Sequence, residues 1–310
     1  MPDLLKVSAV IRVRNNADDL RRCLTGFHQQ RLPAHIELEL IVVDNESTDA
    51  SADVAREMSA KVVPISTALF TWGRALNYGI REASGSLIVI LSSDAYPTNE
   101  NWLFEMIRPF EDASVAAVYG RQISRSDAPV DEQIRLKKQF REESRSVNSI
   151  PENFSADGGD LCVSNACAAI RRTLWNALPY DEEVAGGEEG IWTYEHLKQG
   201  YTIMYQATAC VYHSHKDSIL RHSWRIWELL QKSARLNKKT IHAGSILRAS
   251  LALTKRRIIN CCYPGVSFRG RVMGILRIPF EILALFSIAL VDRKGANIAS
   301  IRSFYWDSKF

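Results

Sequence analysis

The first two hundred residues alternate between short β-branched apolar runs and longer stretches with helical spacing. Runs such as 38–43 and 87–91 are typical of strands that are buried on both faces. In 17–30, by contrast, Leu20, Leu24 and Phe27 recur on one face of a helix. This alternation is typical of βαβ units. The sequence therefore predicts an α/β fold with a Rossmann-like, mostly parallel sheet flanked by helices.

The expected elements follow one another along this region. Strands are predicted over 7–13, 38–43, 61–63, 87–91 and 115–119, and helices over 17–30, 49–59, 74–83 and 99–110. A polar helix is expected within 131–146, followed by a mobile loop that is a candidate cover for a site. Strand and helix patterns resume over 163–213 and disappear beyond 216.

Charge divides the chain into two parts. Residues 1–215 contain 21 Lys and Arg against 30 Asp and Glu, a balance of −9, whereas residues 216–310 contain 18 against 5, a balance of +13. We therefore expect an α/β domain over 1–216, with halves at about 1–120 and 121–216, and a basic helical extension over 217–310. A basic extension attracts polyanions, either nucleic acid or the anionic leaflet of a membrane.

The extension combines basic residues with apolar ones. Residues 218–260 fit amphipathic helices, and 275–291 are nearly all apolar. Arg277, Pro279 and Glu281 interrupt this run, which leaves about ten continuous apolar residues where a membrane span needs about 20. We expect no transmembrane helix. Two interpretations stay open: a helix that lies in the membrane interface, or a helical subdomain that packs on the core or mediates oligomerisation with a second subunit.

The cysteines and the first residues bear on the compartment. Six cysteines form neither a Cys-x-x-Cys pair nor a Cys/His spacing typical of zinc. The start, MPDLLK, lacks the basic and long apolar regions of a signal peptide. The sequence therefore predicts a cytoplasmic protein, with peripheral association at the inner face of the cell membrane if the extension binds lipid.

Polar residues follow three of the predicted strands. Arg14 and Asn15 follow the first strand, Asp44 follows the second, and Ser93 and Asp94 follow a later one. In an open α/β sheet the ligand site forms at the carboxyl ends of the strands. Because neither G-x-G-x-x-G nor G-x-x-x-x-G-K-[ST] is present, dinucleotide and P-loop sites lose their main support. A bound diphosphate would then need a divalent cation held by a carboxylate, for which Asp94 is the candidate.

Six segments occur in order along the chain: VSAVIRVRNN, IVVDNESTDAS, GRALNYGIREASG, LIVILSSDAYP, GGEEGIW and VYHSH. Their order and spacing resemble the inverting nucleotide-sugar glycosyltransferases of family two, which have the GT-A fold. The resemblance covers about residues 5–216. The Ser-x-Asp-Ala-x-Pro form and the doubled His look most like the rhamnosyltransferase branch of that family.

This resemblance implies an enzyme that transfers a sugar with inversion and depends on Mn²⁺ or Mg²⁺. The sugar it implies is L-rhamnose from dTDP- or UDP-rhamnose. The implied acceptor is a saccharide or a lipid-linked oligosaccharide in cell-surface polysaccharide biosynthesis. The donor would bind the half at about 1–120, and the acceptor the half at 121–216.

The family pattern implies donor-binding roles for residues at the strand ends. Asp44 matches the acid that accepts the imide N–H of uracil or thymine, with a turn acid ahead of helix 49–59 as the alternative. Asp94 matches the metal-binding last acid of the family's D-x-D, although Ser92 replaces the first acid. A loop Asp before a turn is the alternative for Asp94. The other residues expected to bind the nucleotide sugar here are Arg14, Asn15 and Ser93.

Gly73, Arg74 and Asn77 match the glycine-started helix that leads into the metal-binding strand. Leu76 replaces the basic residue that usually precedes the Asn. Arg74 is therefore the candidate to meet the diphosphate, and a surface Arg is the alternative. Asn77 is likewise assigned to the nucleotide sugar.

His213 matches a metal ligand that the family places after the last strand. His215 is its rival, because residues two apart in a strand face the same side. A purely structural histidine is the remaining alternative.

Acceptor-binding roles fall on GGEEGIW and on a turn before a strand. Glu189 matches the general base, which takes the proton of the acceptor hydroxyl as it attacks the anomeric carbon. Glu188 and Trp192 are assigned to the acceptor, with Trp192 stacking on the sugar. The alternatives are an acidic helix start and a core aromatic. Ser164 and Asn165 match acceptor contacts, or form a plain turn.

Two other function classes stay open. In a nucleic-acid-binding protein the basic extension would contact phosphate. The apolar run at 275–291 argues against this class, so no nucleic-acid partner is expected. A non-catalytic nucleotide-sugar binder would fit the loss of an acid at Ser92.

Overall fold

The computed structural model describes residues 4–126, 128, 130–151, 163–184, 186–214, 243–261 and 268–293. The chain divides into two compact units, one of residues 1–125 and 136–214 and one of residues 126–135 and 215–310. The first unit contains the sheet. The second contains helices α9 (Ala243–Cys261) and α10 (Phe268–Arg293).

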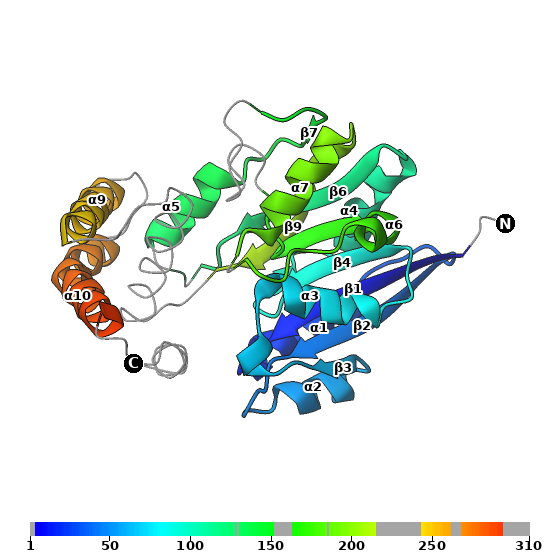
Figure 1. Cartoon of the computed structure of the whole chain (residues 1–310), viewed down its shortest axis with the longest axis horizontal. Helices are drawn as coiled ribbons and strands as arrows, with labels where there is room; N and C mark the ends of the chain where they lie inside the picture. Colours follow the sequence, from blue (N-terminus) through cyan, green and yellow to red (C-terminus); the bar gives the residue numbers. More distant parts are fainter. Residues whose placement is uncertain are drawn as a thin grey trace. The chain divides into compact units, whose positions relative to one another are not determined.

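The first unit is built on one mixed sheet, in which β2, β1 and β4 lie side by side (Figure 1). The strands are β1 (Leu5–Val13), β2 (Ile36–Asp44), β3 (Lys61–Pro64), β4 (Leu87–Ser92), β5 (Ala95–Pro97), β6 (Val115–Ile123), β7 (Arg145–Val147), β8 (Cys167–Arg171) and β9 (Thr202–His213). Their order is β3-β2-β1-β4-β8-β6-β9-β5, and β7 pairs with β9. The first four strands in this order up to β4 run parallel, as do β6 and β9. The predicted α/β fold with a mostly parallel sheet is confirmed, with β5, β7 and β8 added in antiparallel pairings.

Helices cover both faces of this sheet. α1 (Ala17–His28), α2 (Ser51–Glu57) and α4 (Trp102–Ile107) pack in one apolar layer, and α3 (Trp72–Arg81), α6 (Arg172–Ala177) and α7 (Glu188–Lys198) pack in the other. Strand β1 contributes side chains to both layers, since Ala9 and Ile11 lie in the first and Val10 lies in the second. Successive side chains of a strand point to opposite faces. A strand covered on both faces is therefore apolar throughout, which is the pattern seen in the sequence.

The structure departs from the predicted elements where local signals are weak. β5 and β7 have 3 residues each, too few to show a period of two. The helix predicted over 99–110 ends as α4 at Ile107 and continues as a 3-10 turn over Arg108–Glu111, because Pro109 lacks the N–H that an α-helix uses. A second 3-10 turn spans Thr67–Leu69. The polar helix is α5 (Val130–Gln139), and most of the loop expected after 146 lies outside the described residues.

Strand β9 links two parts of the sheet. It pairs in parallel with β6, but its register shifts between the pairs Gly120–Gln206 and Arg121–Cys210. An irregularity of this kind bends a strand. Beyond the shift β9 also pairs with β5, where His213 lies opposite Ala95. The end of β9 is thereby brought beside the loop that follows β4.

The second unit is helical in its described part. Helix α9 covers the end of the predicted amphipathic region, whose residues 218–242 lie outside the described residues. The apolar run at 275–291 lies within α10, which contains Pro279. None of the described helices is long and apolar enough to cross a membrane. The domain boundary expected at 216 stays a prediction.

Candidate active site

The site is built at the edge of the sheet where the parallel strands end. Val13 pairs with Asp44 on one side of β1, and Arg12 pairs with Ser92 on the other. Neighbouring strands lie about 4.8 Å apart. The residues that follow β1, β2 and β4 therefore share one edge, as predicted from the strand ends.

Asp44 ends β2 with an unused acceptor. The residue is only 8% exposed, and its Oδ2 accepts the N–H of Ser47 at 3.3 Å. Its Oδ1 is buried and has no hydrogen-bond partner in the described part of the chain. A buried acceptor without a donor costs free energy. Asp44 is thus partly the turn acid of the alternative interpretation, and its second oxygen suits an N–H donor on a ligand.

Arg14 and Asn15 connect the loop after β1 to the loops after β2 and β3. Asn15 takes a positive φ of 47°, which Asn tolerates better than most residues. Its N–H donates to Ser47 Oγ at 3.0 Å, and its Oδ1 accepts the N–H of Thr48 at 2.7 Å. Arg14 donates to Thr67 Oγ1 at 3.2 Å. These bonds shape the edge around Asp44, and direct contacts with a nucleotide sugar stay a prediction.

A carboxylate and an imidazole face one another where the loop after β4 lies beside the end of β9. His213 Nε2 lies 3.5 Å from Asp94 Oδ1. On the other side of the ring, Nδ1 lies 2.7 Å from the side-chain oxygen of Gln122 in β6. An amide oxygen only accepts, so Nδ1 donates this hydrogen bond, and Nε2 is the ring nitrogen that faces Asp94. This orientation suits a shared divalent cation.

The protein supplies few further ligands at this point. The described residues contain no cluster of three or more His, Cys, Asp and Glu side chains that could hold a metal ion. Ser93, beside Asp94, is buried and accepts a hydrogen bond from Asn16 Nδ2 at 3.2 Å. Asp94 and His213 offer one oxygen and one nitrogen donor, which is fewer ligands than a divalent cation takes. His215, the rival ligand, lies outside the described residues.

Two carboxylates begin helix α7. Gly187 caps the helix with a φ of 81°, a conformation that glycine adopts without strain. Glu188 is buried, with its Oε1 3.6 Å from Arg12 Nη1 and 3.3 Å from Asn165 Nδ2. Glu189 is half-buried beside it. The helix N-terminus favours both charges, and the contact with Arg12 places Glu188 at the edge where β1 ends.

Buried tyrosines lie below the two glutamates. Burial raises the pKa of Tyr119, and the charges of Glu189 and Glu188 raise it further. Burial likewise raises the pKa of Tyr180, and both carboxylates add to that shift. Both phenols therefore stay neutral and act as hydrogen-bonding groups. Tyr180 donates to Asn165 Oδ1 at 3.3 Å.

Asn165 and Ser164 support the site from the start of β8. Asn165 uses its oxygen for Tyr180 and its amide nitrogen for Glu188, so the side chain holds Glu188 in position. Ser164 Oγ accepts the N–H of Ala166 at 3.3 Å, which is the plain turn of the alternative interpretation. Contact of these residues with an acceptor stays a prediction.

Asn77, which is expected to bind the nucleotide sugar, makes its hydrogen bonds within the protein. Its side chain is 1% exposed. Its amide nitrogen donates to Tyr180 O at 2.8 Å and to Glu182 Oε1 at 2.9 Å. Its oxygen accepts from Trp175 Nε1 at 2.9 Å and from the Tyr180 N–H at 3.1 Å. All its hydrogen-bonding capacity is used within the protein, so Asn77 ties α3 to the segment that follows α6.

Arg74 is engaged by two glutamates. Its Nε donates to Glu182 and its Nη2 to Glu183, each at 2.8 Å, and its Nη1 donates to Leu69 O at 2.8 Å. The hydrogen bond with Glu182 raises the pKa of Arg74. These acids already balance its charge, which makes Arg74 a poor candidate to meet a diphosphate. We leave it out of the site.

Trp192 is a core residue, the alternative to the expected stacking on a sugar. Its side chain is 1% exposed, and its indole N–H donates to Leu178 O at 2.8 Å. One ring face stacks on His196 with centroids 3.7 Å apart. No face is left for an acceptor sugar, and Trp192 instead anchors α7 to the sheet.

Sequence reasoning missed two residues that shape the site. Arg12 is a charged residue in a buried strand, with its guanidinium 4.8 Å from the Trp72 ring and an ion pair to Glu188. Buried arginines are rare unless they are paired, so its position inside an apolar run was a usable signal. Gln122 is the buried partner of His213. The sequence around Gln122 gave no comparable indication, because a polar residue near a strand end is common.

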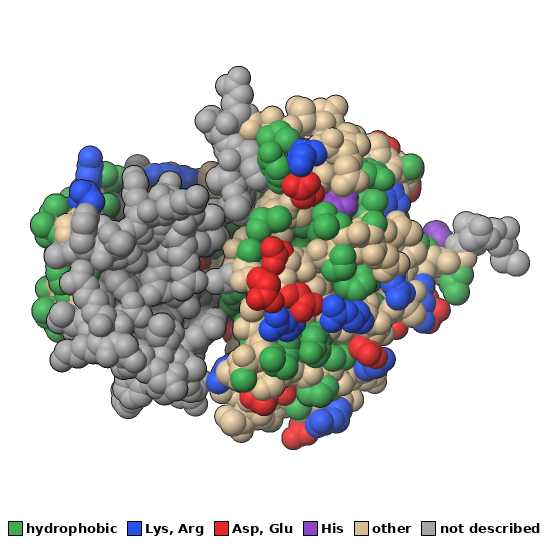
Figure 2. All heavy atoms as spheres, in the orientation of Figure 1, with side chains coloured by type: hydrophobic (Ala, Val, Ile, Leu, Met, Phe, Trp, Pro, Cys, Tyr) green, Lys and Arg blue, Asp and Glu red, His purple; other side chains and the backbone are tan. Residues whose placement is uncertain are grey.

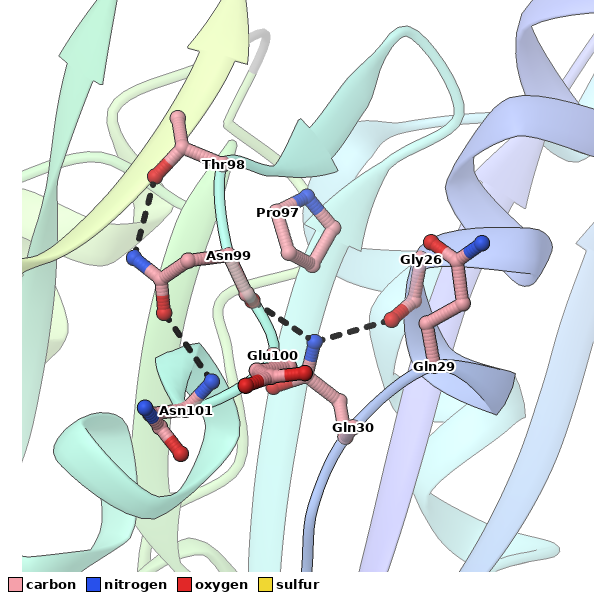
Figure 3. Close-up of a pocket in the computed structure, with 8 residues that line it drawn as sticks. All are labelled: Gly26, Gln29, Gln30, Pro97, Thr98, Asn99, Glu100 and Asn101. Carbon is pink, nitrogen blue, oxygen red and sulfur yellow. Dashed lines mark hydrogen bonds between the residues drawn. The ribbon is translucent and has the colours of Figure 1, made fainter.

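Two cavities of the first unit lie between the end of α1 and the turn after β5. One of about 420 Å³ is lined by Gly26 and Gln30 of the α1 end and by the turn at 97–101. Figure 3 shows the Gln30 side chain between Gly26 and Asn99, with hydrogen bonds to Gly26 O at 2.9 Å and Asn99 O at 3.0 Å. A second, of about 630 Å³, shares Gly26 and Pro97 with it. Neither is lined by a residue predicted to act in the site.

Comparison with solved structures defines the class of protein. The mannosyltransferase of Pyrobaculum calidifontis, solved in complex with GDP-Man and Mn²⁺, superposes with a TM-score of 0.54 at 17% identity, covering 95% of this chain and 77% of that one. TarS 1–349 of S. aureus superposes with a TM-score of 0.53 at 14% identity, covering 94% and 92%. At these identities the likeness shows the fold, which is that of the GT-A glycosyltransferases.

The family follows from the sequence comparison. Residues 8–178, more than half of the chain, match the profile of glycosyl transferase family 2, and the chain belongs to that family. It is 30% identical to the O-antigen chain rhamnosyltransferase WbaN of Salmonella anatum over 199 residues, which cover 61% of this chain and 60% of that protein. It is 26% identical to the O-antigen chain rhamnosyltransferase RfbN of Salmonella typhimurium over 216 residues, 68% of this chain and 67% of the relative. The predictions of a family-two glycosyltransferase and of its fold are confirmed.

Proposed function

We propose that the protein transfers L-rhamnose, with inversion, from dTDP- or UDP-rhamnose to a saccharide or lipid-linked acceptor in cell-surface polysaccharide synthesis, with the help of Mn²⁺ or Mg²⁺. Its similarity to two O-antigen chain rhamnosyltransferases supports the sugar. The observation that carries the chemistry is the Asp94–His213 pair, held beside the strand ends by Gln122.

The unused oxygen of Asp44 supports recognition of the base. Uracil and thymine carry an N–H at position 3, which can donate to this carboxylate. Cytosine has an unprotonated nitrogen there and would place a lone pair against the charge. Asp44 would therefore favour dTDP and UDP donors over CDP donors, and the desolvated acceptor would gain the partner that it lacks.

Asp94 and His213 would hold the divalent cation. When bound, the ion would stabilise the negative charge that develops on the leaving diphosphate. Gln122 Oε1 accepts a hydrogen bond from His213 Nδ1, which turns the opposite ring nitrogen towards Asp94. Ser92, in place of an acid, leaves the protein with one carboxylate ligand here, so we expect the affinity for the ion to depend on the bound donor.

Glu189 is our candidate for the general base. The oxygen of the acceptor hydroxyl forms the new bond to the anomeric carbon, the bond from that carbon to the diphosphate breaks, and the hydroxyl proton passes to the Glu189 carboxylate. Glu188 is fixed by Arg12 and Asn165 and is 3% exposed. The half-buried Glu189 is thus the one of the two that an acceptor can reach.

Substitution of the base tests the proposal. Glu189→Gln should lower kcat by a factor on the order of 10² to 10⁴, because it removes the proton acceptor, and should leave the affinity for dTDP or UDP nearly unchanged. Glu195→Gln, on the same helix but ion-paired with Lys198, is the matched control and should keep its activity. Turnover of dTDP-L-rhamnose and UDP-rhamnose measures the kcat of the two variants, and calorimetric titration measures their affinity for dTDP and UDP. Full activity of Glu189→Gln would remove Glu189 from the mechanism.

A further inference from the structure

Helix α10 exposes a continuous apolar stripe. Its side chains recur at spacings of three and four residues, which places them on one face of the helix. Their exposed fractions range from 37% to 81%. The stripe comprises Phe268, Val272, Ile275, Leu276, Phe280 and Leu283. With a rise of about 1.5 Å per residue, it runs for about 22 Å along the helix.

The opposite side of α10 buries a charged residue. Glu281 is 2% exposed, and its Oε1 lies 3.5 Å from Arg277 Nε. A helix on the surface of a water-soluble domain shows the reverse arrangement, with apolar residues inside and charges outside. The exposed stripe is therefore unsuited to water, and exposed apolar patches of this kind mark surfaces that bind a partner.

Helix α9, which packs against α10, adds positive charge to apolar residues. It exposes Leu247, Leu251, Ile258 and Ile259. Arg248 and Lys255 are exposed among them. Its sequence, AGSILRASLALTKRRIINC, contains basic residues and no acidic one. Figure 2 shows hydrophobic side chains over α9 and α10 at the left edge of the view, with Lys and Arg above them.

Charge decides which partner fits this surface. Residues 216–310 carry 18 Lys and Arg against 5 Asp and Glu. A second copy of the chain would bring the same positive charge against it, which repels. Nucleic acid would neutralise the charge but leave the apolar stripe in water. An anionic lipid surface accommodates both the positive charge and the apolar stripe, since apolar side chains enter the acyl boundary while Lys and Arg contact the headgroups.

We propose that the exposed faces of α9 and α10 form a surface that binds an anionic lipid bilayer, with the helices lying in the interface. The stripe of α10 enters the acyl boundary, and Arg248 and Lys255 contact headgroup phosphates. Lipid binding stands independently of the catalytic proposal. Only its purpose, access to a lipid-linked acceptor, rests on the proposed function.

Vesicle flotation of the full chain tests this surface. We expect the protein to float with vesicles of equimolar phosphatidylcholine and phosphatidylglycerol and to float weakly with phosphatidylcholine alone. Leu276→Glu combined with Phe280→Glu should weaken binding to the anionic vesicles by about tenfold or more, because charge enters the apolar stripe. Arg248→Ser combined with Lys255→Ser should weaken binding and flatten its dependence on salt. Leu4→Glu, at an exposed apolar position of the first unit, is the control and should bind as the wild type does.

Three results would overturn the proposal. One is a wild-type chain that stays unbound with anionic vesicles. Another is a Leu276→Glu/Phe280→Glu chain that folds by circular dichroism and binds as the wild type does. The third is a dimer in sedimentation analysis that this double variant dissociates, without vesicle binding, which would assign the stripe to a second copy. Donor turnover with a soluble acceptor is measured alongside, so a failure of the lipid surface is distinguished from a failure of the catalytic proposal.

Discussion

The two units of this chain treat polar and apolar side chains in opposite ways. The sheet unit buries Val, Ile and Leu on both faces of the sheet, and its few buried charges, such as Arg12 and Glu188, meet one another at the strand ends. In the second unit α10 buries Glu281 and exposes Phe268 and Phe280. The first unit follows the pattern of a domain in water, with polar groups gathered at one edge of its sheet, whereas the exposed apolar face of α10 fits the lipid-binding surface that we propose.

A large stability effect should come from breaking the hydrogen bonds that Asn77 makes in the first unit. Asn77→Leu should lower the free energy of unfolding by about 2–4 kcal/mol, because Trp175 Nε1 and both backbone groups of Tyr180 lose their partner. Chemical denaturation measures the change. Asn101→Ala, at an exposed position, should shift it by less than about 0.5 kcal/mol. A normally stable Asn77→Leu chain that fails to bind donor would return Asn77 to the site.

The metal-binding geometry should depend on a residue that does not touch the ion. Gln122→Leu removes the acceptor of the His213 Nδ1 proton, so the affinity for Mn²⁺ in the presence of UDP should fall by about 10- to 100-fold. Gln122→Glu keeps an acceptor and should keep the affinity. Calorimetry measures the Mn²⁺ affinity of each variant directly, without relying on turnover. Equal losses in both variants would mean that Gln122 only fills space.

A smaller effect should follow at Asp44, where the expected interaction is one hydrogen bond. Asp44→Asn replaces a charged acceptor by a neutral one and should weaken UDP binding by about tenfold. Binding of CDP, which has no N–H at position 3, should change much less. A titration series with both nucleotides measures the contrast. The same loss for UDP and CDP would show that Asp44 does not read the base.

The smallest effect on stability should appear in the second unit. A charge on the exposed face of α10 is compared with a charge in the core of the sheet. Phe280→Glu places a charge on an exposed face and should change the unfolding free energy by less than about 0.5 kcal/mol in the absence of lipid. Leu91→Glu, at a fully buried position of β4, should unfold the first unit. Thermal unfolding compares the two. Destabilisation by Phe280→Glu of several kcal/mol would mean that the stripe is part of a folded core.

Much of the sheet unit could be predicted because its strands carry strong local signals. Each of β1, β2 and β4 contains a buried apolar run, over 9–11, 40–43 and 87–91, and Asp44 and Asp94 follow two of these runs. β5 and β7 are too short to show a pattern, and the antiparallel direction of β8 depends on contacts with distant strands. Strand direction is a tertiary property that local periodicity does not encode.

The site was predictable to the extent that it depends on strand ends. Asp94 and His213 meet as expected, but the orientation of His213 depends on Gln122, 91 residues away in the chain. Asn77 and Trp192 show the limit of the approach. Both match family motifs, yet their partners, Tyr180 and Leu178, turn them into structural residues. A motif reports which residues are present, whereas burial decides what they can touch.

The central claim is that the strand-end edge of the first unit binds a nucleoside diphosphate through a cation held by Asp94 and His213. Calorimetric titration of UDP and dTDP, in Mn²⁺ and in chelator, tests it most directly. We predict binding at least about tenfold tighter with Mn²⁺, with this difference abolished in Asp94→Asn and kept in Asp53→Asn, an exposed control on α2. Equal affinities with and without the metal in the wild-type protein would contradict the claim.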